Sequence, residues 1–179
     1  MRDTPNALGG LDLIISTTGD WPSDCALNVA FREWSSFPPV LFGWSEAYGI
    51  AGHALLVNQN GGCLACGLTE HGTFEERVTD WQSSEKTLIR ATGCGDFYQP
   101  YGVVDVAPTK AMISELALEY LSTRFNHSEW RTWVGDVARL VGLGGSVFGQ
   151  WKEKLSAGDA GRKFFHQQWA QNPRCPLCN

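Results

Sequence analysis

The sequence predicts an α/β fold stapled by four cysteines. An apolar run, an amphipathic helix and a second apolar run follow one another over residues 11–44, which is the pattern of a βαβ unit with parallel strands. A long helix with one apolar face is predicted over Pro108–Phe125. Two Cys-x-x-Cys pairs, at 63–66 and 175–178, supply the four thiolates that a closed tetrahedral zinc site needs.

Composition sets the class of protein. The chain has 179 residues, of which 43% are hydrophobic and 18% charged, so it is globular and long enough for one domain with a sizeable core. Its net charge of −5 argues against nucleic acid or a membrane surface as an electrostatic partner. No signal peptide or apolar run of membrane-spanning length is present, and six cysteines without a secretory signal indicate reduced thiols in the cytoplasm. Residues 1–10 are expected to be a frayed start or a cut linker.

The first three elements follow from apolar patterning. Leu11–Thr17 is expected to be a strand buried on both faces, and Pro39–Trp44 a second buried strand. Between them Trp21–Trp34 is expected to be a helix, with Asp20 or Trp21 at its N-cap and Pro22 in its first turn. Its predicted apolar stripe, which would make its cysteine a core residue, consists of Cys25, Ala26, Val29 and Ala30.

The third strand leads into the first cysteine pair. His53–Val57 is expected to be buried, with His53 as a structural histidine, and a glycine-rich turn then reaches Cys63-x-x-Cys66. The matching pair Cys175-x-x-Cys178 favours one zinc ion on all four sulfurs, which would tie the chain end to the middle of the domain. A redox-active Cys-x-x-Cys, two disulfides and unrelated core cysteines are the alternatives.

The second half is less regular. Residues 69–93 are expected to be an exposed connection with at most short elements. Residues 130–151 are expected to form strands and hairpin turns. Gly142–Gly149 superficially resembles a dinucleotide-binding loop, but Val147 stands where that motif requires glycine, so a hairpin is expected. Phe164–Trp169 is expected to be a last strand or a short helix.

Several motifs together resemble a known family. In order, the chain carries DLIISTTGDWPSDCALN, EAYGIAGHALLV, CLACG, GCGDFYQPYG and CPLC. This order resembles the ThiF/MoeB/HesA superfamily of ATP-dependent adenylyltransferases, which are related to ubiquitin-activating enzymes. It is most similar to bacterial ThiF-type domains of ubiquitin-like conjugation and antiphage defence operons. The resemblance covers residues 11–179 and matches the second half of a Rossmann-like adenylation domain, with a crossover loop at about 69–107. The glycine-rich ATP loop of the first half is not in the sequence, so we expect a fragment of a longer enzyme or a shortened gene product.

The resemblance implies a mechanism and its residues. The complete enzyme would bind Mg-ATP, adenylate the C-terminus of a ubiquitin-like carrier protein and pass it as a thioester to Cys94, which Gly93 and Gly95 flank. Asp20 is the nearest candidate for magnesium, although Gly19 occupies the position where the family usually has the aspartate, and Asp20 can equally be only a helix cap. The resemblance also implies a homodimer or heterodimer. The alternatives are a non-catalytic, zinc-stabilised partner subunit or interaction module lacking the ATP-binding half and, less in keeping with two matched pairs, a thiol oxidoreductase.

Overall fold

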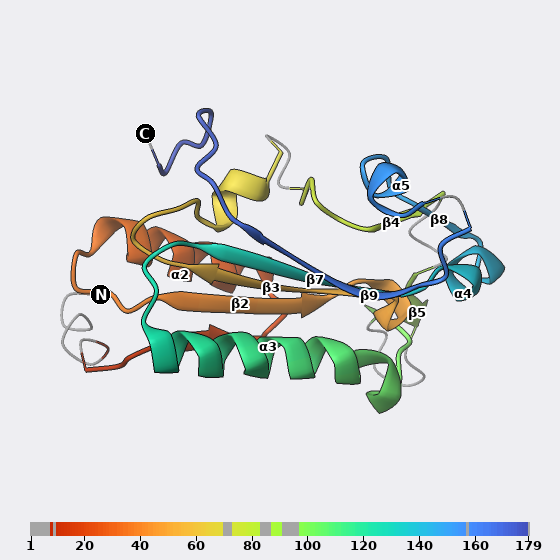
Figure 1. Ribbon diagram of the computed structural model, residues 1–179, viewed down its shortest axis with the longest axis horizontal. Coiled ribbons are helices and arrows are strands. Elements are labelled where there is room, and N and C mark those ends of the chain that lie inside the picture. The colour runs from red at the N-terminus through yellow and green to blue at the C-terminus, as the bar shows by residue number, and fades with distance from the viewer. Residues whose placement is uncertain are drawn as a thin grey trace.

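The fold is a mixed five-stranded sheet with helices on both faces (Figure 1). The structure is a computed structural model that describes residues 8, 10–69, 73–82, 87–90, 97–156 and 158–178. The strand order is β1-β2-β3-β7-β9. β1 and β2 are parallel, and every other neighbouring pair is antiparallel. The α/β class predicted from the sequence is therefore confirmed, and the bounds of the five strands are Ile14–Ser16, Val40–Ser45, Ala51–Val57, Glu129–Asp136 and Gly161–Gln168.

The parallel pair is joined by α2 (Trp21–Glu33), as the βαβ pattern predicted. Asp20 is its N-cap, because the Asp20 carboxylate accepts a hydrogen bond from the Ser23 backbone N–H at 3.1 Å. The predicted apolar stripe is wrong in part, since Cys25 is only half-buried and Ala26 is exposed, whereas Ala30 packs against the core. The residues that α2 buries are Asp24, Asn28 and Phe31.

Burial of the strands depends on their place in the sheet. All seven residues of β3 are buried, and Val40–Gly43 of β2 are buried as well, as predicted for both strands. β1 was predicted to be buried on both faces, and this is wrong. It pairs only with β2 among the described residues, so it forms an edge of the sheet, and Ile15 is 51% exposed.

One long helix, α3 (Val103–Thr123), covers one face of the sheet (Figure 1). It starts before the predicted Pro108, because the Asp105 carboxylate accepts a hydrogen bond from the Gly102 N–H at 2.7 Å and caps it there. Its contact with the sheet is close. A Cβ at Gly43 would lie 2.3 Å from Ile113 Cδ1, and one at Gly52 would lie 1.9 Å from Thr109 Oγ1. Glycine at these two positions lets the helix rest on β2 and β3.

The opposite face carries the main core. α2, the Cys63–Cys66 segment and the chain end lie over it (Figure 1). Most of the eight tryptophans contribute to packing. In the main core, aromatic rings from four different parts of the chain meet, with centroid separations of 4.9–5.9 Å among Trp44, His53, Phe74 and Trp130.

The connection after residue 68 is less exposed than predicted. Phe74, Val78 and Thr79 are buried, and β4 (Thr79–Trp81) pairs antiparallel with β8 (Gly145–Val147). The predicted hairpin at Gly142–Gly149 is also wrong, because the short helix α4 (Val137–Gly142) precedes β8 and the partner of β8 is remote in sequence. Two further strands, β5 (Ile89–Arg90) and β6 (Phe97–Tyr98), pair with each other. The remaining elements are the 3₁₀ turns at Ala47–Gly49 and Leu64–Gly67 and the short helix α5 (Trp151–Lys154).

The final segment is a strand, the first of the two predicted forms. β9 pairs with β7 along its length and forms the second edge of the sheet. Among the described residues, none of the helices combines the length and the apolar character needed to cross a membrane.

Candidate metal centre and cleft

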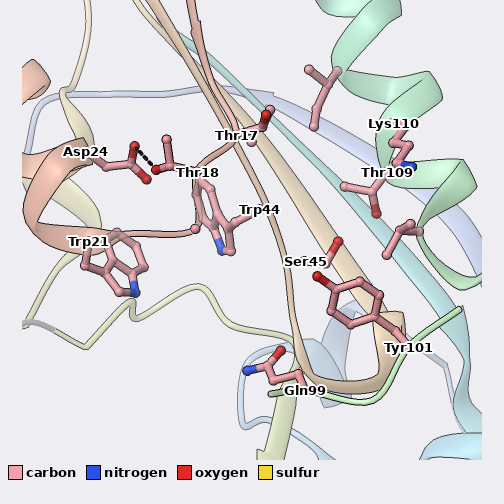
Figure 2. Close-up of a pocket in the computed structure, with 14 residues that line it drawn as sticks. Thr17, Thr18, Trp21, Asp24, Trp44, Ser45, Gln99, Tyr101, Thr109 and Lys110 are labelled. Atoms are coloured by element: carbon pink, nitrogen blue, oxygen red, sulfur yellow. Dashed lines mark hydrogen bonds between the residues drawn. The ribbon is translucent and has the colours of Figure 1, made fainter. Parts of the chain in front are cut away.

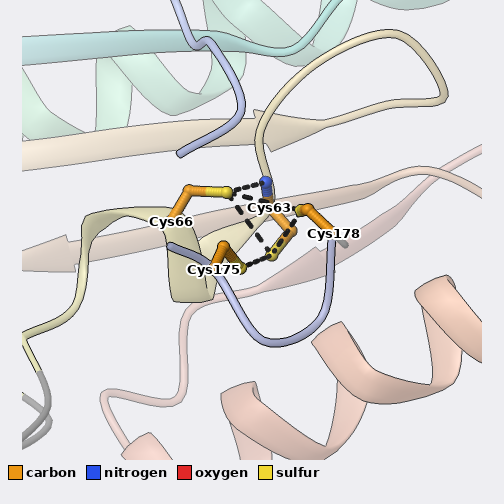
Figure 3. A group of neighbouring side chains, drawn as sticks. All are labelled: Cys63, Cys66, Cys175 and Cys178. Atoms are coloured by element: carbon orange, nitrogen blue, oxygen red, sulfur yellow. Dashed lines mark hydrogen bonds between the residues drawn. The ribbon is translucent and has the colours of Figure 1, made fainter. Parts of the chain in front are cut away.

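The four cysteines of the two pairs meet in space (Figure 3). Their sulfur atoms all lie within 4.8 Å of one another. Cys63 Sγ is 3.7 Å from Cys175 Sγ and 3.5 Å from Cys178 Sγ, and Cys66 Sγ is 3.4 Å from Cys178 Sγ. A disulfide needs a separation of about 2.0 Å. A tetrahedron with metal–sulfur bonds of about 2.3 Å has edges of about 3.8 Å. The cluster is therefore compatible with a structural metal site, and the disulfide alternative does not fit it.

Local backbone geometry builds each half of the cluster. The Cys66 N–H donates to the Cys63 carbonyl at 3.1 Å, and the Cys178 N–H donates to the Cys175 carbonyl at 3.4 Å. The end of β9 is held against the first pair by Trp169, whose indole N–H donates to the Cys63 carbonyl at 2.9 Å. The Gly62 N–H donates to the Trp169 carbonyl at 2.7 Å, and a Cβ at Gly62 would lie 2.3 Å from a backbone oxygen. Glycine there allows the two chains to approach.

Hydrogen-bond donors surround the sulfur atoms. Cys66 Sγ accepts from the N–H groups of Cys63 at 3.3 Å and Asn172 at 3.4 Å, and Cys178 Sγ accepts from Arg32 Nη2 at 3.0 Å. Four thiolates around a divalent ion leave a net charge of −2, which the Arg32 guanidinium partly offsets. Such outer partners fix the orientation of metal ligands and tune the site.

The close contacts among the sulfur atoms also shift the pKa values of the thiols. A hydrogen bond from the Cys66 thiol lowers the pKa of Cys63 to about 4. The same contact, followed by burial, raises the pKa of Cys66, and burial raises the pKa of Cys178 to about 11. A metal ion that binds all four sulfurs displaces the protons that they carry in its absence.

A cleft of about 840 Å³ opens at the carboxyl ends of β1 and β2, beside the first turn of α2 (Figure 2). The crevice outside the carboxyl ends of parallel strands is where α/β proteins bind ligands. The residues that line it and are labelled in Figure 2 are Thr17, Thr18, Trp21, Asp24, Trp44, Ser45, Gln99, Tyr101, Thr109 and Lys110.

The two sides of the cleft differ in charge. On one side Asp24 is buried, and its carboxylate accepts from Ser16 Oγ at 2.5 Å and Thr18 Oγ1 at 3.4 Å. On the other side Lys110 forms no ion pair within the described part of the chain. Next to it Thr109 Oγ1 is buried without a hydrogen-bond partner in the same part. This side can accept an anionic or carbonyl group of a ligand.

A second hollow of about 570 Å³ shares Trp21, Trp44, Ser45 and Gln99 with the cleft, so the two adjoin. Its further walls come from the segment after Cys66, through Phe74, Arg77, Asp80 and Trp81. Together the hollow and the cleft form a groove with aromatic side chains where they join.

The predicted site residues have different outcomes. Cys94 lies outside the described residues, so its role as nucleophile stays a prediction. Asp20 caps α2, and hydrogen bonds from the Ser23 side chain and backbone lower the pKa of its exposed carboxylate. Its magnesium role also stays a prediction. His53 is a satisfied core residue, as predicted, with its ring 2.7 Å from Glu46 Oε1 and 3.2 Å from Thr132 Oγ1.

Sequence reasoning missed Asp24, Ser45 and Lys110. The rule that ligands bind beyond parallel strand ends indicates Ser45, because it ends β2. Lys110 carries no such signal, since its place beside the cleft depends on how α3 crosses the sheet.

Neither a scan of the sequence against models of protein families nor a search of curated proteins finds a match. Function is therefore inferred from the site together with the sequence motifs.

Proposed function

We propose that the chain is the second half of a ThiF-type adenylation domain, whose cleft receives the C-terminal tail of a ubiquitin-like protein for ATP-dependent activation. The observation that carries the proposal is the position of the cleft. It lies at the carboxyl ends of β1 and β2, the parallel pair, where Thr17–Gly19 and the start of α2 meet the return of the chain through Gln99 and Tyr101.

The open edge at β1 supports a second half of the sheet. Parallel strands in α/β proteins are normally covered on both faces. In the described part of the chain β1 pairs only with β2, and Leu11 and Ile15 are 49% and 51% exposed. The ATP-binding half would continue the sheet from β1, from the same polypeptide or from another one.

The chemistry of the cleft suits an extended tail that ends in a carboxylate. Lys110 and the hydroxyl of Ser45 would hold the terminal glycine. A carboxylate oxygen of the tail would attack the α-phosphorus of ATP and displace pyrophosphate. The Cys94 thiolate would then attack the acyl carbon of the adenylate, form a thioester and release AMP.

We further propose that the metal of the cysteine cluster is zinc. Four sulfur ligands close a tetrahedral site and leave no position for water or substrate, so the ion is structural. Cys63, Cys66, Cys175 and Cys178 would hold it, and it would fix the end of the chain to the Cys63–Cys66 segment.

Peptide binding tests the proposal on this chain. Trp21 and Trp44 line the cleft, so tryptophan fluorescence should report binding of acetyl-Ala-Ala-Gly-Gly with a free carboxylate. The corresponding carboxamide should bind at least about tenfold more weakly, and so should the free acid to Lys110→Ala, since one charge-assisted hydrogen bond contributes about 1.5–3 kcal/mol. Lys152→Ala, which changes an exposed lysine outside the cleft, is the matched control. Equal affinity for acid and amide would contradict the proposal.

Activity tests the complete enzyme. With the ATP-binding half supplied, ATP, magnesium and the carrier protein should give an adduct on Cys94 that a reducing thiol cleaves. Cys94→Ala should abolish the adduct and leave ATP–pyrophosphate exchange intact, because adenylation comes before thiol attack. An adduct that survives Cys94→Ala would place the nucleophile elsewhere.

A non-catalytic partner subunit is the second candidate, and one observation favours it. Gly19 stands where the family usually has its magnesium aspartate, and the neighbouring Asp20 is already engaged as the cap of α2. Absence of ATP–pyrophosphate exchange in the reconstituted enzyme, together with formation of a stable complex with an ATP-binding chain, would establish this candidate.

A further inference from the structure

Glu46 places a carboxylate between the central sheet and the segment that leads away from the cysteine pair. It directly follows β2, and its side chain is 10% exposed. Its Oε1 accepts from the Val78 N–H at 2.6 Å, and its Oε2 accepts from the Thr79 N–H at 2.7 Å and from Thr79 Oγ1 at 2.5 Å. Val78 and Thr79 are both buried, so their N–H groups depend on an acceptor within the protein. The carboxylate thus accepts the hydrogen bonds that these two amides would otherwise donate to a neighbouring strand.

The carboxylate is in turn held by the sheet. His53 Nε2 lies 2.7 Å from Glu46 Oε1, and because an ionised carboxylate only accepts hydrogen bonds, this nitrogen carries the proton. His53 is fully buried in β3, and its Nδ1 lies 3.2 Å from Thr132 Oγ1 of β7. Its ring is stacked between Trp44 and Trp130, with centroids 4.9 and 5.7 Å away. Glu46 therefore has a rigid support.

The same β2–β3 connection holds the segment at a second point. The Tyr48 ring lies 5.4 Å from that of Trp81 in β4. Tyr48 has a φ of 59°, a left-handed conformation that is rare for a bulky residue and is found where surrounding contacts impose it. A chain of hydrogen bonds also connects Trp81 to Glu46. The Trp81 indole N–H donates to Thr79 Oγ1 at 3.0 Å, and the Thr79 hydroxyl donates to the Glu46 carboxylate.

The returning chain rests on this connection as well. A Cβ at Gly49 would lie 2.7 Å from Asp105 Cβ, in the first turn of α3. Both stems of the chain between Trp81 and Gly102 are thus anchored on residues 46–49. The second hollow of the groove is walled by Glu46, Thr79, Trp81 and Gln99, so the anchor shapes the groove directly.

We propose that Glu46 is a positioning residue that fixes the first stem of the crossover segment over the groove. Its significance for thioester transfer rests on the proposed function, because Cys94 belongs to the same segment. The anchoring of Val78 and Thr79 by Glu46 is independent of the proposed function. Glu46 does not touch the reacting atoms, and it acts through the backbone of Val78 and Thr79.

Residue-resolved amide exchange of the chain tests the anchor. In Glu46→Ala the Val78 and Thr79 amides should exchange at least tenfold faster, whereas those of Leu55 and Leu56 in β3 should keep the wild-type rate. Glu46→Gln retains one acceptor oxygen and should accelerate exchange at one of the two positions. Unchanged exchange at both positions in folded Glu46→Ala would refute the proposal. Equal acceleration in β3 would refute it too, because the role would then be general stability.

Thr79 gives a matched spectroscopic control. Thr79→Val removes the hydroxyl and keeps both backbone N–H groups. It should shift the Trp81 indole N–H resonance and leave exchange at position 78 unchanged, and Thr79→Ser should restore the resonance. In the enzyme completed with its ATP-binding half, Glu46→Gln should slow adduct formation on Cys94 by a larger factor than it slows ATP–pyrophosphate exchange. If wild type forms no adduct, the proposed function fails while amide exchange still decides the anchor. If wild type forms the adduct and Glu46→Gln matches it, the positioning role fails and the function stands.

Discussion

Removing the metal should destabilise the whole domain, because the cysteine cluster joins two distant parts of the chain. The staple joins residues 112 positions apart in sequence, and three of its four cysteines are buried. A ligand that binds only the folded chain stabilises it by about 4 kcal/mol when present at about 1,000 times its dissociation constant. A domain of this length shifts its melting temperature by about 2–4 °C per kcal/mol, so chelation or Cys175→Ser should lower the melting temperature by about 8–16 °C.

Metal analysis and thermal unfolding by circular dichroism check this prediction together. Wild-type protein should contain one zinc per chain, and Cys175→Ser should lose it. Cys25→Ser is the control, because Cys25 is half-buried on α2 and outside the cluster, so its zinc content should not change. A melting temperature that shifts by less than about 2 °C on loss of the metal would refute the staple, since the binding energy would then not be coupled to folding.

Three further predictions follow from packing, from the missing motif and from charge. Gly43→Ala should destabilise the domain by about 1–3 kcal/mol through overpacking. Urea unfolding should show a smaller cost when Ile113→Val is added, because this removes the Cδ1 atom that lies 2.3 Å from the new Cβ. The chain alone should not bind ATP tightly by calorimetry, since it lacks a glycine-rich phosphate loop, and micromolar affinity would reveal an unrecognised nucleotide site. For Glu46, burial acts to raise the pKa, but hydrogen bonds from His53, Thr79 and Val78 outweigh it and lower the pKa below the ordinary value of 4.5. A lowered folded-state pKa stabilises the fold above the ordinary pKa, and this contribution is lost as the pH falls through the lowered value. In an NMR titration the Trp81 indole N–H should therefore shift below about pH 4.5 in wild type and not in Glu46→Gln.

Elements with a regular apolar pattern were predictable, because their burial is one-sided or complete. β2, β3 and the body of α3 follow from such patterns. The cysteine cluster follows from the matching Cys-x-x-Cys spacing of its two pairs, which is typical of a shared metal site whatever the fold. The predictive pattern is local in each of these features, because it lies within one strand, one helix or one Cys-x-x-Cys pair.

Pairings between remote short segments were not predictable. β4 has three residues, and its partner β8 lies beyond α3 and β7, so neither shows a period long enough to read. The anchor on Glu46 has the same origin. A carboxylate that substitutes for a strand partner leaves no mark in the sequence except an acidic residue after an apolar run.

The wrong prediction for α2 shows why the candidate site was the hardest part to read. Asp24, Asn28 and Arg32 recur at helical spacing along the side of α2 that faces the sheet and the cysteine cluster. Each satisfies a different partner. Asp24 accepts from Ser16 at the cleft, Asn28 Oδ1 accepts from the Leu64 N–H within the first cysteine pair at 2.9 Å, and Arg32 donates to Cys178 Sγ. Apolar patterning assigns such residues to solvent, and burial of Asp24 and Asn28 is tolerated because both side chains find hydrogen-bond partners. One polar stripe on one helix thus contacts both the cleft and the cysteine cluster.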